Sequence, residues 1–548
     1  MEYKSPLDML YQWEQTQPDK VYLRQPVNDV WHTWTWKQAA EEVRRMTTAL
    51  IAMDLLPHSN IAMISKNCAH WILCDLAIMM SGHISVPLYP NLTEDTIRQI
   101  LEHCNATLLF VGKLDDWPAM KAGVPEEIKC ISLPFCTYED YETWNDIITK
   151  YPPVKENIRR NPEEIVTIIY TSGTTGMPKG VVHKYYNFSF AISNASSYLG
   201  FSNNERFFSY LPLSHIAERI LVEMGSLYTG GEVFFAESLK KFSTNLAEAQ
   251  PTIFLGVHRI WSKFQEGVLK KSSQKKLNVL LKIPVISGIV RQKIKRGLGL
   301  AKAKNVFTGA SPTPVSLIQW FKTIGIKIQE AYAMTENCCY SHVTHNKMIK
   351  IGFVGQALPE CEAKLDHNDE ILIRHEALMV GYYKEHVTTS ESFTTEGFLR
   401  TGDQGLIDEE GYLKITGRVK DLFKTGKGKY VAPSPIEMKM SAYSDLDFVC
   451  IVGTGLPQPI AMVTLSEGGK KKARKELESV LEQLLTATNA TLDAHEKLAK
   501  MVVLNDEWTV ENGMLTPSFK IKRHNIEKKY ANRYEKWHDE KGMLIFEN

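Results

Sequence analysis

Residues 170–180 constrain the fold and chemistry of this chain more than any other segment. They read YTSGTTGMPKG, and the five residues before them, 165–169, are all apolar or β-branched. This pattern predicts a buried strand that ends in a loop whose backbone N–H groups, hydroxyl groups and lysine can surround phosphate oxygens. A Walker loop would end in Gly-Lys-Ser/Thr, whereas here Pro178 precedes Lys179 and Gly180 follows it. We interpret the segment as a phosphate-binding loop of another kind. A flexible linker is the alternative, although linkers seldom follow a buried strand.

Length and charge indicate a globular protein of at least two domains. A chain of 548 residues is too long for a single hydrophobic core. The 64 basic and 63 acidic residues nearly cancel, which removes any global electrostatic argument for binding nucleic acid.

Targeting signals and cysteine usage point to the cytoplasm. No apolar signal segment follows Met1, and the longest apolar stretch, residues 71–90, is interrupted by Asp75, Gly82 and His83. The nine cysteines form no Cys-x-x-Cys pair, which is typical of a reducing compartment and argues against a zinc cluster. We therefore expect a cytoplasmic protein without a membrane-spanning helix.

The order of the predicted elements indicates an α/β fold. Residues 7–110 alternate helical patterns with short apolar strands, and residues 113–160 are expected to be surface connection. After the glycine-rich loop we expect a helix at 183–199. Further strands are expected at 61–64, 108–111, 233–235, 252–255, 305–307 and 327–329.

The C-terminal third changes character twice. Residues 352–415 show a period of two between turn signals, which predicts a β-rich subdomain. The run 417–429 combines glycines with cations, and we place a domain boundary there. The prediction is a large, multi-layered N-terminal α/β domain, residues 1–417, and a small, mobile α+β C-terminal domain, residues 418–548.

Three further motifs suit a nucleotide site. In the segment 329–336, Tyr332 could stack on a purine, Thr335 could bond a phosphate and Glu336 could hold Mg²⁺. The alternative is an ordinary strand end with a buried tyrosine. Asp403, after a Thr-Gly turn, could accept hydrogen bonds from both ribose hydroxyls, with an Asx turn as the alternative. Arg418 offers a permanent cation, or belongs to a surface charge patch.

Taken together and in this order, the four motifs resemble those of the acyl-adenylate-forming (AMP-binding) superfamily. This superfamily includes acyl-CoA synthetases, nonribosomal peptide adenylation domains and firefly luciferase. The resemblance runs from about residue 10 to about residue 530, nearly the whole chain. Segments 211–219, 251–261, 424–433 and 515–523 look like the corresponding stretches of the long-chain fatty acid–CoA ligase branch.

The resemblance implies a ligase with three substrates, a fatty acid, ATP and coenzyme A, and with Mg²⁺. The carboxylate would attack ATP, releasing pyrophosphate, and the acyl group would then pass from AMP to the thiol of coenzyme A. Cations and hydrogen-bond donors would offset the repulsion between carboxylate and phosphate. The residues that would hold the β- and γ-phosphates are Thr171, Ser172, Gly173, Thr174, Thr175, Gly176 and Lys179.

The remaining nucleotide contacts follow from the same resemblance. Thr335 would contact the α-phosphate, and Glu336 and Thr171 would be the magnesium ligands. The adenine would be framed by Gly309, Ala310, Ser311 and Tyr332. Asp403 would bind the ribose hydroxyls, and Arg418 would assist at the ribose or phosphate.

Lys520 matches the lysine of the family's C-terminal domain that bridges the carboxylate and the phosphoryl oxygens. Without the upstream motifs it would read as one member of an exposed basic cluster. Lys420 matches the hinge about which that domain rotates between half-reactions. The rotation would bring the turn formed by Gly426, Lys427 and Gly428 to the coenzyme A site, where glycines allow close approach to a narrow thiol arm.

A last catalytic assignment and two departures from the family pattern concern the walls of the site. His215 matches a position that gates the pantetheine tunnel, with a satisfied core histidine as the alternative. Ala333 and His258 stand where the family usually has glycine and proline. Neither change removes a charged or hydrogen-bonding group, so we expect both to be tolerated.

The acyl pocket and any membrane contact are less constrained. The helix after the loop, with Tyr186, Phe188, Phe190, Ile192 and Tyr198, could line the pocket, although aromatic residues at helical spacing are usually core. Residues 277–304 are apolar first and basic later. They suit peripheral contact with the inner face of a membrane, but we favour a surface helix whose lysine stems cover apolar neighbours. No pattern indicates an oligomeric state.

Two other functional hypotheses remain at this point. The chain could be a fatty acyl-AMP ligase that loads a carrier protein, or a ligase for medium-chain or aryl acids. A catalytically inactive nucleotide-binding protein is disfavoured because Lys179, Glu336, Asp403, Arg418 and Lys520 are all present.

Overall fold

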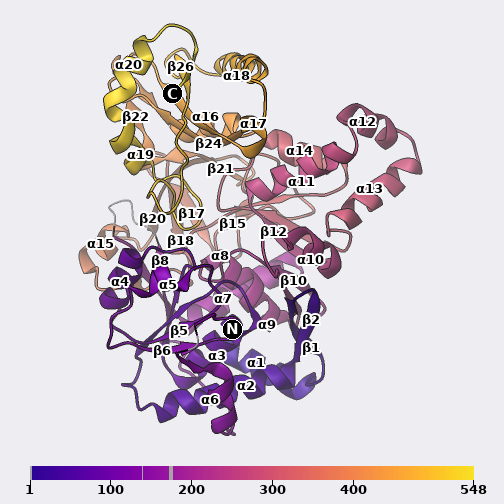
Figure 1. The fold of residues 1–548 in the computed structure, drawn as a ribbon, viewed down its shortest axis with the longest axis vertical. Helices are drawn as coiled ribbons and strands as arrows, with labels where there is room; N and C mark the ends of the chain where they lie inside the picture. Colours follow the sequence, from indigo (N-terminus) through magenta and orange to yellow (C-terminus); the bar gives the residue numbers. More distant parts are fainter. Residues whose placement is uncertain (1–2, 139, 172–176, 548) are drawn as a thin grey trace.

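A computed structural model describes residues 3–138, 140–171 and 177–547, and most of this chain forms an α/β body built on two large sheets (Figure 1). In the described residues one sheet has nine strands, ordered β16-β15-β14-β13-β12-β10-β11-β1-β2. Their bounds, in that order, are Gln356–Ala357, His342–Val343, Gln329–Tyr332, Asn305–Thr308, Ile253–Gly256, Arg206–Ser209, Glu232–Phe235, Val21–Val27 and Val30–Thr35.

The second large sheet has eight strands in the described residues, ordered β19-β9-β8-β4-β3-β5-β6-β7. Their bounds are Gly381–Tyr382, Lys179–Lys184, Ile165–Thr171, Ile84–Leu88, Asn60–Ile64, Ala106–Val111, Lys129–Ser132 and Glu142–Thr143. The central strands run parallel, whereas β8 and β9 are antiparallel and pair Thr171 with Lys179. The two ends of the glycine-rich loop are therefore adjacent in the sheet.

Helix α3 (Ala69–Ser81) explains how the two sheets share a core. Every residue from Ala69 to Met80 is buried, so this helix is enclosed on all sides, as expected for a helix that is apolar all round. The main hydrophobic cluster joins it to α1 (Pro6–Thr16), α2 (Trp36–Ala52), α7 (Tyr185–Leu199) and strands of both sheets.

Asp75 is the single charged residue of α3. It is fully buried, and the equally buried Arg219 neutralises its charge. Arg219 Nη2 donates to Asp75 Oδ1 and Oδ2 at 2.7 and 2.6 Å, and Nη1 donates to Thr167 Oγ1 at 2.7 Å. Arg219 begins a π-helix (Arg219–Met224), a rare form that often marks a functional region. The neighbouring Glu223 has a raised pKa, chiefly because it is buried.

The remaining helices of the body cover the sheets or extend from them. They are α4 (Glu94–His103), α5 (Trp117–Lys121), α6 (Trp144–Lys150), α8 (Ile216–Glu218), α9 (Gly225–Thr229), α10 (Phe242–Ala249), α11 (His258–Lys271), α12 (Gln274–Lys282), α13 (Ile286–Gly297), α14 (Val315–Thr323) and α15 (His386–Glu391). Helices α12 and α13 project from the body at its edge (Figure 1).

The β-rich subdomain and the C-terminal part complete the chain. The subdomain is an antiparallel sheet of β17 (Glu362–Leu365), β18 (Glu370–Arg374), β20 (Leu399–Ile407) and β21 (Leu413–Arg418). The C-terminal sheet contains β24 (Leu446–Val452), β25 (Ile460–Leu465), β26 (Lys500–Val503) and β27 (Leu544–Phe546), and a separate hairpin joins β22 (Phe423–Lys424) to β23 (Tyr430–Val431). Helices α16 (Pro433–Met440), α17 (Glu467–Lys470), α18 (Arg474–Asn489), α19 (Arg523–Tyr530) and α20 (Tyr534–Asp539) surround these strands.

Two hydrophobic clusters contain only residues from position 423 onward, so the C-terminal part has a core of its own. The mixed α/β class is confirmed. The placement of the boundary between residues 417 and 418 stays a prediction. None of the helices in the described ranges combines the length and the apolar composition needed to cross a bilayer.

Several predicted elements differ from the observed ones. Residues 113–160 were expected to be surface connection, but they contain β6, β7 and two helices, and Trp144 and Ile147 enter the core. The helix expected at 183–199 begins at Tyr185, because residues 179–184 form strand β9. The strand expected at 327–329 is β14, which extends to Tyr332. Polar residues within β6, β9 and β14 weakened the strand signal.

Candidate functional site

A cavity of about 3160 Å³ lies between the body and the C-terminal part. Residues that follow the carboxyl ends of the adjacent strands β10, β12 and β13 line it, which is where parallel sheets commonly bind ligands. The C-terminal part contributes the segment 516–525. Asn91 Nδ2 donates to the carbonyl of Pro517 at 3.0 Å and so connects this segment to the body.

One wall of the cavity carries the ends of the glycine-rich loop. Thr171 ends β8, Lys179 begins β9, and both line the cavity. Lys179 Nζ lies 5.0 Å from the centre of the Tyr382 ring, and Tyr382 Oη donates to Glu336 Oε1 at 2.9 Å. The predicted phosphate ligands Ser172, Gly173, Thr174, Thr175 and Gly176 lie outside the described residues.

Glu336 is the carboxylate beside the ends of the glycine-rich loop, to which Tyr382 connects it. Burial raises its pKa, and the hydrogen bond from Tyr382 and the charge of Arg418 act in the opposite direction. A divalent cation would favour the charged form. Within the described ranges no group of three or more His, Cys, Asp or Glu side chains is arranged to hold a metal ion. Glu336 and Thr171 nevertheless fit Mg²⁺, because this ion typically takes one or two carboxylates from the protein and completes its shell with phosphate and water oxygens.

Thr335 precedes Glu336 in the chain, and a hydrogen bond from His183 holds its backbone. The carbonyl of Thr335 accepts a hydrogen bond from His183 Nε2 at 2.8 Å, and both residues are buried. Burial lowers the pKa of His183 to about 4, so its imidazole is neutral at pH 7. The threonine is therefore fixed at the cavity edge by a neutral donor on β9.

Asp403, Arg418 and Tyr332 form a connected group that also lines the cavity. Asp403 and Arg418 are paired across β20 and β21, and Arg418 Nε donates to Asp403 Oδ1 at 2.9 Å. Tyr332 Oη donates to Asp403 Oδ2 at 2.8 Å. The charge of Asp403 raises the pKa of Arg418, which stays a cation. The adjoining segment with Gly309, Ala310 and Ser311 also lines the cavity, and Ala310 has a left-handed backbone, φ 64°.

Lys520 lies in the same cavity. Surrounding protein groups displace water from its ammonium, and this lowers its pKa; the charge of Arg418 lowers it further, while Asp403 and Glu336 oppose the shift. Solvent still reaches the residue. A lysine 340 residues beyond the glycine-rich loop thus lines the same cavity as Glu336 and Asp403.

His215 faces this lysine from the body. Burial, together with the charge of Lys520, lowers the pKa of His215 to about 4. Its Nδ1 accepts a hydrogen bond from the Ala217 N–H at 3.2 Å, which leaves the proton of the neutral ring on Nε2. The residue lines the cavity and caps the short helix α8. A neutral imidazole can donate a hydrogen bond here without adding a charge to the cavity.

The structure does not bring every predicted residue to the cavity. Lys420, in the short 3-10 helix Val419–Asp421, lines it, as expected of a residue at the junction of the two parts. Gly426, Lys427 and Gly428 are exposed in the turn between β22 and β23 and are not among the lining residues. In this arrangement of the two parts, the predicted coenzyme A turn is therefore away from the site.

Beyond the polar walls, part of the cavity is apolar. Of the five residues proposed on α7, only Ile192 lines it; Phe188 and Phe190 are buried in the core, and Tyr186 and Tyr198 pack against it. The interpretation of the aromatic residues as core is the correct one. The apolar lining comes from several elements, namely Ile192, Ala195, Leu199, Ile216, Ile220, Leu255, Val257, Phe307, Val343 and Leu358.

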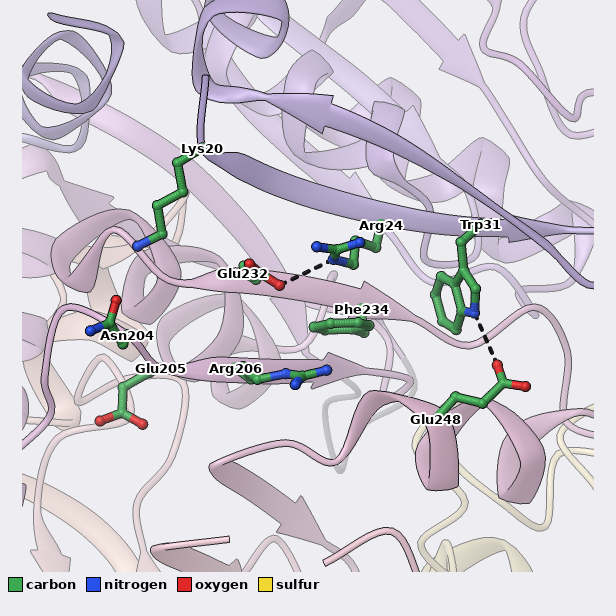
Figure 2. A pocket seen from close by; sticks show the side chains of 9 residues that line it. All are labelled: Lys20, Arg24, Trp31, Asn204, Glu205, Arg206, Glu232, Phe234 and Glu248. Carbon is green, nitrogen blue, oxygen red and sulfur yellow. Dashed lines mark hydrogen bonds and ion pairs between the residues drawn. The ribbon is translucent and has the colours of Figure 1, made fainter. Parts of the chain in front are cut away.

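A second cavity, of about 460 Å³, lies elsewhere on the body (Figure 2). Residues of β1, β2, β10, β11 and α10 and of neighbouring loops line it, and none of the predicted site residues is among them. Its charges are largely used internally, since Arg24 pairs with Glu232 at 3.1 Å and Arg206 lies over the Phe234 ring. This cavity is not the candidate active site.

Three contacting residues were missed by sequence reasoning. Tyr382 connects Lys179 to Glu336, His183 holds Thr335, and Arg259 on α11 pairs with Asp447 on β24, across the cavity from the body to the C-terminal part. A sequence signal was available only for Arg259, which lies in one of the ligase-like segments. The other two act through strand pairing, which joins residues far apart in the chain.

Comparisons with known proteins agree with this geometry. A family model described as AMP-binding enzyme matches residues 10–383, and one described as AMP-binding enzyme C-terminal domain matches residues 420–541. Among curated proteins, long-chain-fatty-acid–CoA ligase FadD15 of Mycobacterium tuberculosis is 25% identical, covering 97% of each chain. Long chain acyl-CoA synthetase 7, peroxisomal, of Arabidopsis thaliana is 29% identical, covering 93% of this chain and 82% of its own.

The fold also matches solved structures. The anthranilate CoA ligase AuaEII, crystallised with anthranoyl-AMP, superposes with a TM-score of 0.79 at 20% identity, covering 97% of this chain and 98% of that one. At this identity the match supports the fold and not the substrate.

Proposed function

The chain belongs to the family of AMP-binding enzymes, and on this premise we propose that it is a long-chain fatty acid–CoA ligase. It activates a fatty acid with ATP to acyl-AMP, releasing pyrophosphate, and transfers the acyl group to coenzyme A. The observation that carries the proposal is one cavity that Lys520, Asp403 and Glu336 line together while apolar side chains line another part. The names of the long-chain ligases among its relatives support the substrate class.

The residues divide between the reacting groups by charge. Lys179 and the loop hold the phosphates that leave, and Thr335 bonds the α-phosphate. Glu336, with Thr171, would hold a magnesium ion, which supplies positive charge to the phosphate oxygens. Asp403 accepts the ribose hydroxyls, Arg418 supports it, and the segment with Gly309, Ala310 and Ser311 frames the adenine with Tyr332.

Lys520 brings the two anions together. Its ammonium reaches the fatty acid carboxylate and an oxygen of the α-phosphate, so that their repulsion is reduced as the new C–O–P bond forms and the bond to pyrophosphate breaks. Protein groups around Lys520 partly remove the water from its ammonium, which lowers its pKa and leaves the charge available to substrate oxygens. Once pyrophosphate has left, rotation about Lys420 withdraws Lys520 and presents Gly426, Lys427 and Gly428 to the pantetheine arm.

The second step needs a free thiolate and a path to the acyl carbon. His215, neutral and at the cavity wall, gates this path without attracting the phosphates of coenzyme A away from their own site. The thiolate attacks the acyl carbon and AMP leaves with the oxygen that joined it to the acyl group. We place the enzyme in the cytoplasm, with peripheral contact to a membrane when it takes up its substrate.

The experiment that tests this function measures products with and without coenzyme A. The protein is incubated with ATP, Mg²⁺ and fatty acids of graded length. We expect AMP and acyl-CoA in equal amounts, with long chains preferred. Acyl-AMP that persists despite coenzyme A would favour a carrier-protein acceptor, and preference for a medium-chain or aryl acid would reassign the substrate. No consumption of ATP with any acid would refute a ligase.

The ion pair between Arg259 and Asp447 predicts a selective effect on the first half-reaction. The guanidinium also lies 4.9 Å from the centre of the Phe448 ring, so this arginine connects the body to the C-terminal part in the arrangement that places Lys520 in the site. Arg259→Glu should lower the rate of ATP–pyrophosphate exchange about three- to tenfold, because an exposed pair contributes up to about 1 kcal/mol and the variant adds repulsion. Thioester formation from supplied acyl-AMP should be nearly unchanged.

A charge swap provides the control. Adding Asp447→Arg to Arg259→Glu restores the attraction, and pyrophosphate exchange should return to at least half of the original rate. If the double variant were as slow as the single one, or if both half-reactions slowed equally, Arg259 would act on substrate rather than on the arrangement of the two parts.

A further inference from the structure

The hairpin of α12 and α13, with its flanking residues 270–304, is the most strongly charged segment of the chain. It contains no Asp or Glu, although the whole chain has a net charge of only +1. Of the basic residues in this segment, only Lys304 has an ion-pair partner within the described part of the chain; the partner is Glu205, at 3.1 Å. The eleven basic residues are Lys270, Lys271, Lys275, Lys276, Lys282, Arg291, Lys293, Lys295, Arg296, Lys302 and Lys304.

The same hairpin exposes large aliphatic side chains. Leu277 is buried, and Leu281, Val290 and Ile294 pack against the hydrophobic core beneath. Helix α13 has no buried residue. A surface helix was expected here and is observed, although the lysine stems leave several aliphatic side chains uncovered. The aliphatic residues left in contact with water, with exposed fractions of 39 to 80%, are Val279, Ile283, Val285, Ile286 and Ile289.

Position relates the hairpin to the active site. The cavity wall continues along α11 as far as Lys270 in its last turn, and the hairpin follows directly. Figure 1 shows α12 and α13 extending beyond the rest of the body. A surface that meets the tip of the hairpin would thus lie beside one edge of the cavity.

We propose that this hairpin docks on an anionic lipid bilayer and holds the cavity edge near the surface from which the fatty acid is taken. The inference rests on the proposed function for its purpose, but the docking itself needs no substrate. Basic residues bind the anionic headgroups, and the exposed aliphatic residues enter the boundary between headgroups and acyl chains. A second copy of this chain is disfavoured because two such surfaces repel, and nucleic acid would leave the aliphatic residues unused.

Flotation with vesicles tests the docking. The full chain is mixed with vesicles of phosphatidylcholine alone or with added phosphatidylglycerol, without ATP or fatty acid. We expect binding only to the anionic vesicles, weaker at high salt because the headgroup field is screened. Lys275→Gln/Lys276→Gln/Lys282→Gln should lower the affinity about tenfold or more. Val279→Ser/Val285→Ser/Ile289→Ser should lower it while leaving the charge unchanged.

A matched control removes three exposed charges elsewhere, with Lys471→Gln/Lys475→Gln/Lys497→Gln, and should bind vesicles like the unchanged protein. Equal binding by control and hairpin variants, or no binding to anionic vesicles, would overturn the proposal. Concentration-dependent dimers, or RNA binding, lost in the hairpin variants without vesicle binding would overturn it in favour of that partner. Turnover of a short, soluble acid, measured without vesicles, should be the same in all variants. Its absence in the unchanged protein would refute the ligase and not the docking.

Discussion

Lys520→Ala should reduce acyl-AMP formation by about 10²- to 10³-fold, the loss usually seen when one group that stabilises a developing charge is removed. Lys520 lines the cavity together with Asp403, Glu336 and Arg418. Acyl transfer from supplied acyl-AMP to coenzyme A should change less than about threefold, because the proposed rotation about Lys420 would withdraw Lys520 in that step. ATP–pyrophosphate exchange and thioester formation, measured separately, provide the two rates.

Lys522→Ala is the matched control, since it removes the same charge two residues away on the same segment. It should keep most of the pyrophosphate exchange. Equal loss of both half-reactions in Lys520→Ala would show that the residue stabilises the C-terminal part or binds ATP generally. Equal loss in the two variants would assign the effect to charge in the segment and not to Lys520.

Arg219→Met should lower the free energy of unfolding by about 3–5 kcal/mol, because it leaves the buried charge of Asp75 without its cationic partner. Both side chains are fully buried, and Arg219 also bonds Thr167, so one residue connects α3, β8 and the π-helix that follows His215. Urea denaturation, followed through the transition of the N-terminal body, measures the loss.

Two further variants separate charge burial from simple loss of an arginine. Arg219→Met/Asp75→Leu removes both partners and should recover a large part of the lost stability, since apolar replacements of buried pairs are often neutral. Arg45→Met removes a half-exposed arginine that pairs with Glu41 and should cost less than about 1 kcal/mol. A single Arg219 variant as stable as Arg45→Met would contradict the role of this cluster.

The four motifs were sufficient to predict the superfamily, and the alternation of helical patterns with short apolar strands predicted the α/β class. Asp403 and Arg418 were proposed separately, and the antiparallel pairing of β20 and β21 places them opposite one another. Strand β9 was missed because residues 179 and 180 were assigned to the glycine-rich loop and a helix was expected from residue 183, which left only two valines as a strand signal. The period-two signal of residues 352–415 was clear since that sheet has a solvent-facing side.

Contacts between distant segments could not be predicted from residue types. Tyr382 is not unusual in the sequence, and it becomes part of the site only because β19 pairs with β9 and brings its ring over Lys179. The buried pair of Asp75 and Arg219 joins residues 144 positions apart. The exposure of the aliphatic residues on α13 could not be predicted either, because periodicity does not show whether another element packs against a helix.

The central claim is that the carboxylate of the fatty acid attacks the α-phosphate of ATP, and the fate of carboxylate oxygen tests it most directly. A fatty acid labelled with ¹⁸O in both carboxylate oxygens is turned over with ATP, Mg²⁺ and coenzyme A. The ¹⁸O content of each product is then measured by mass spectrometry. Attack at the α-phosphate leaves one labelled oxygen in AMP and none in pyrophosphate. Label in inorganic phosphate together with ADP, or unlabelled AMP alongside acyl-CoA, would contradict an acyl-adenylate route.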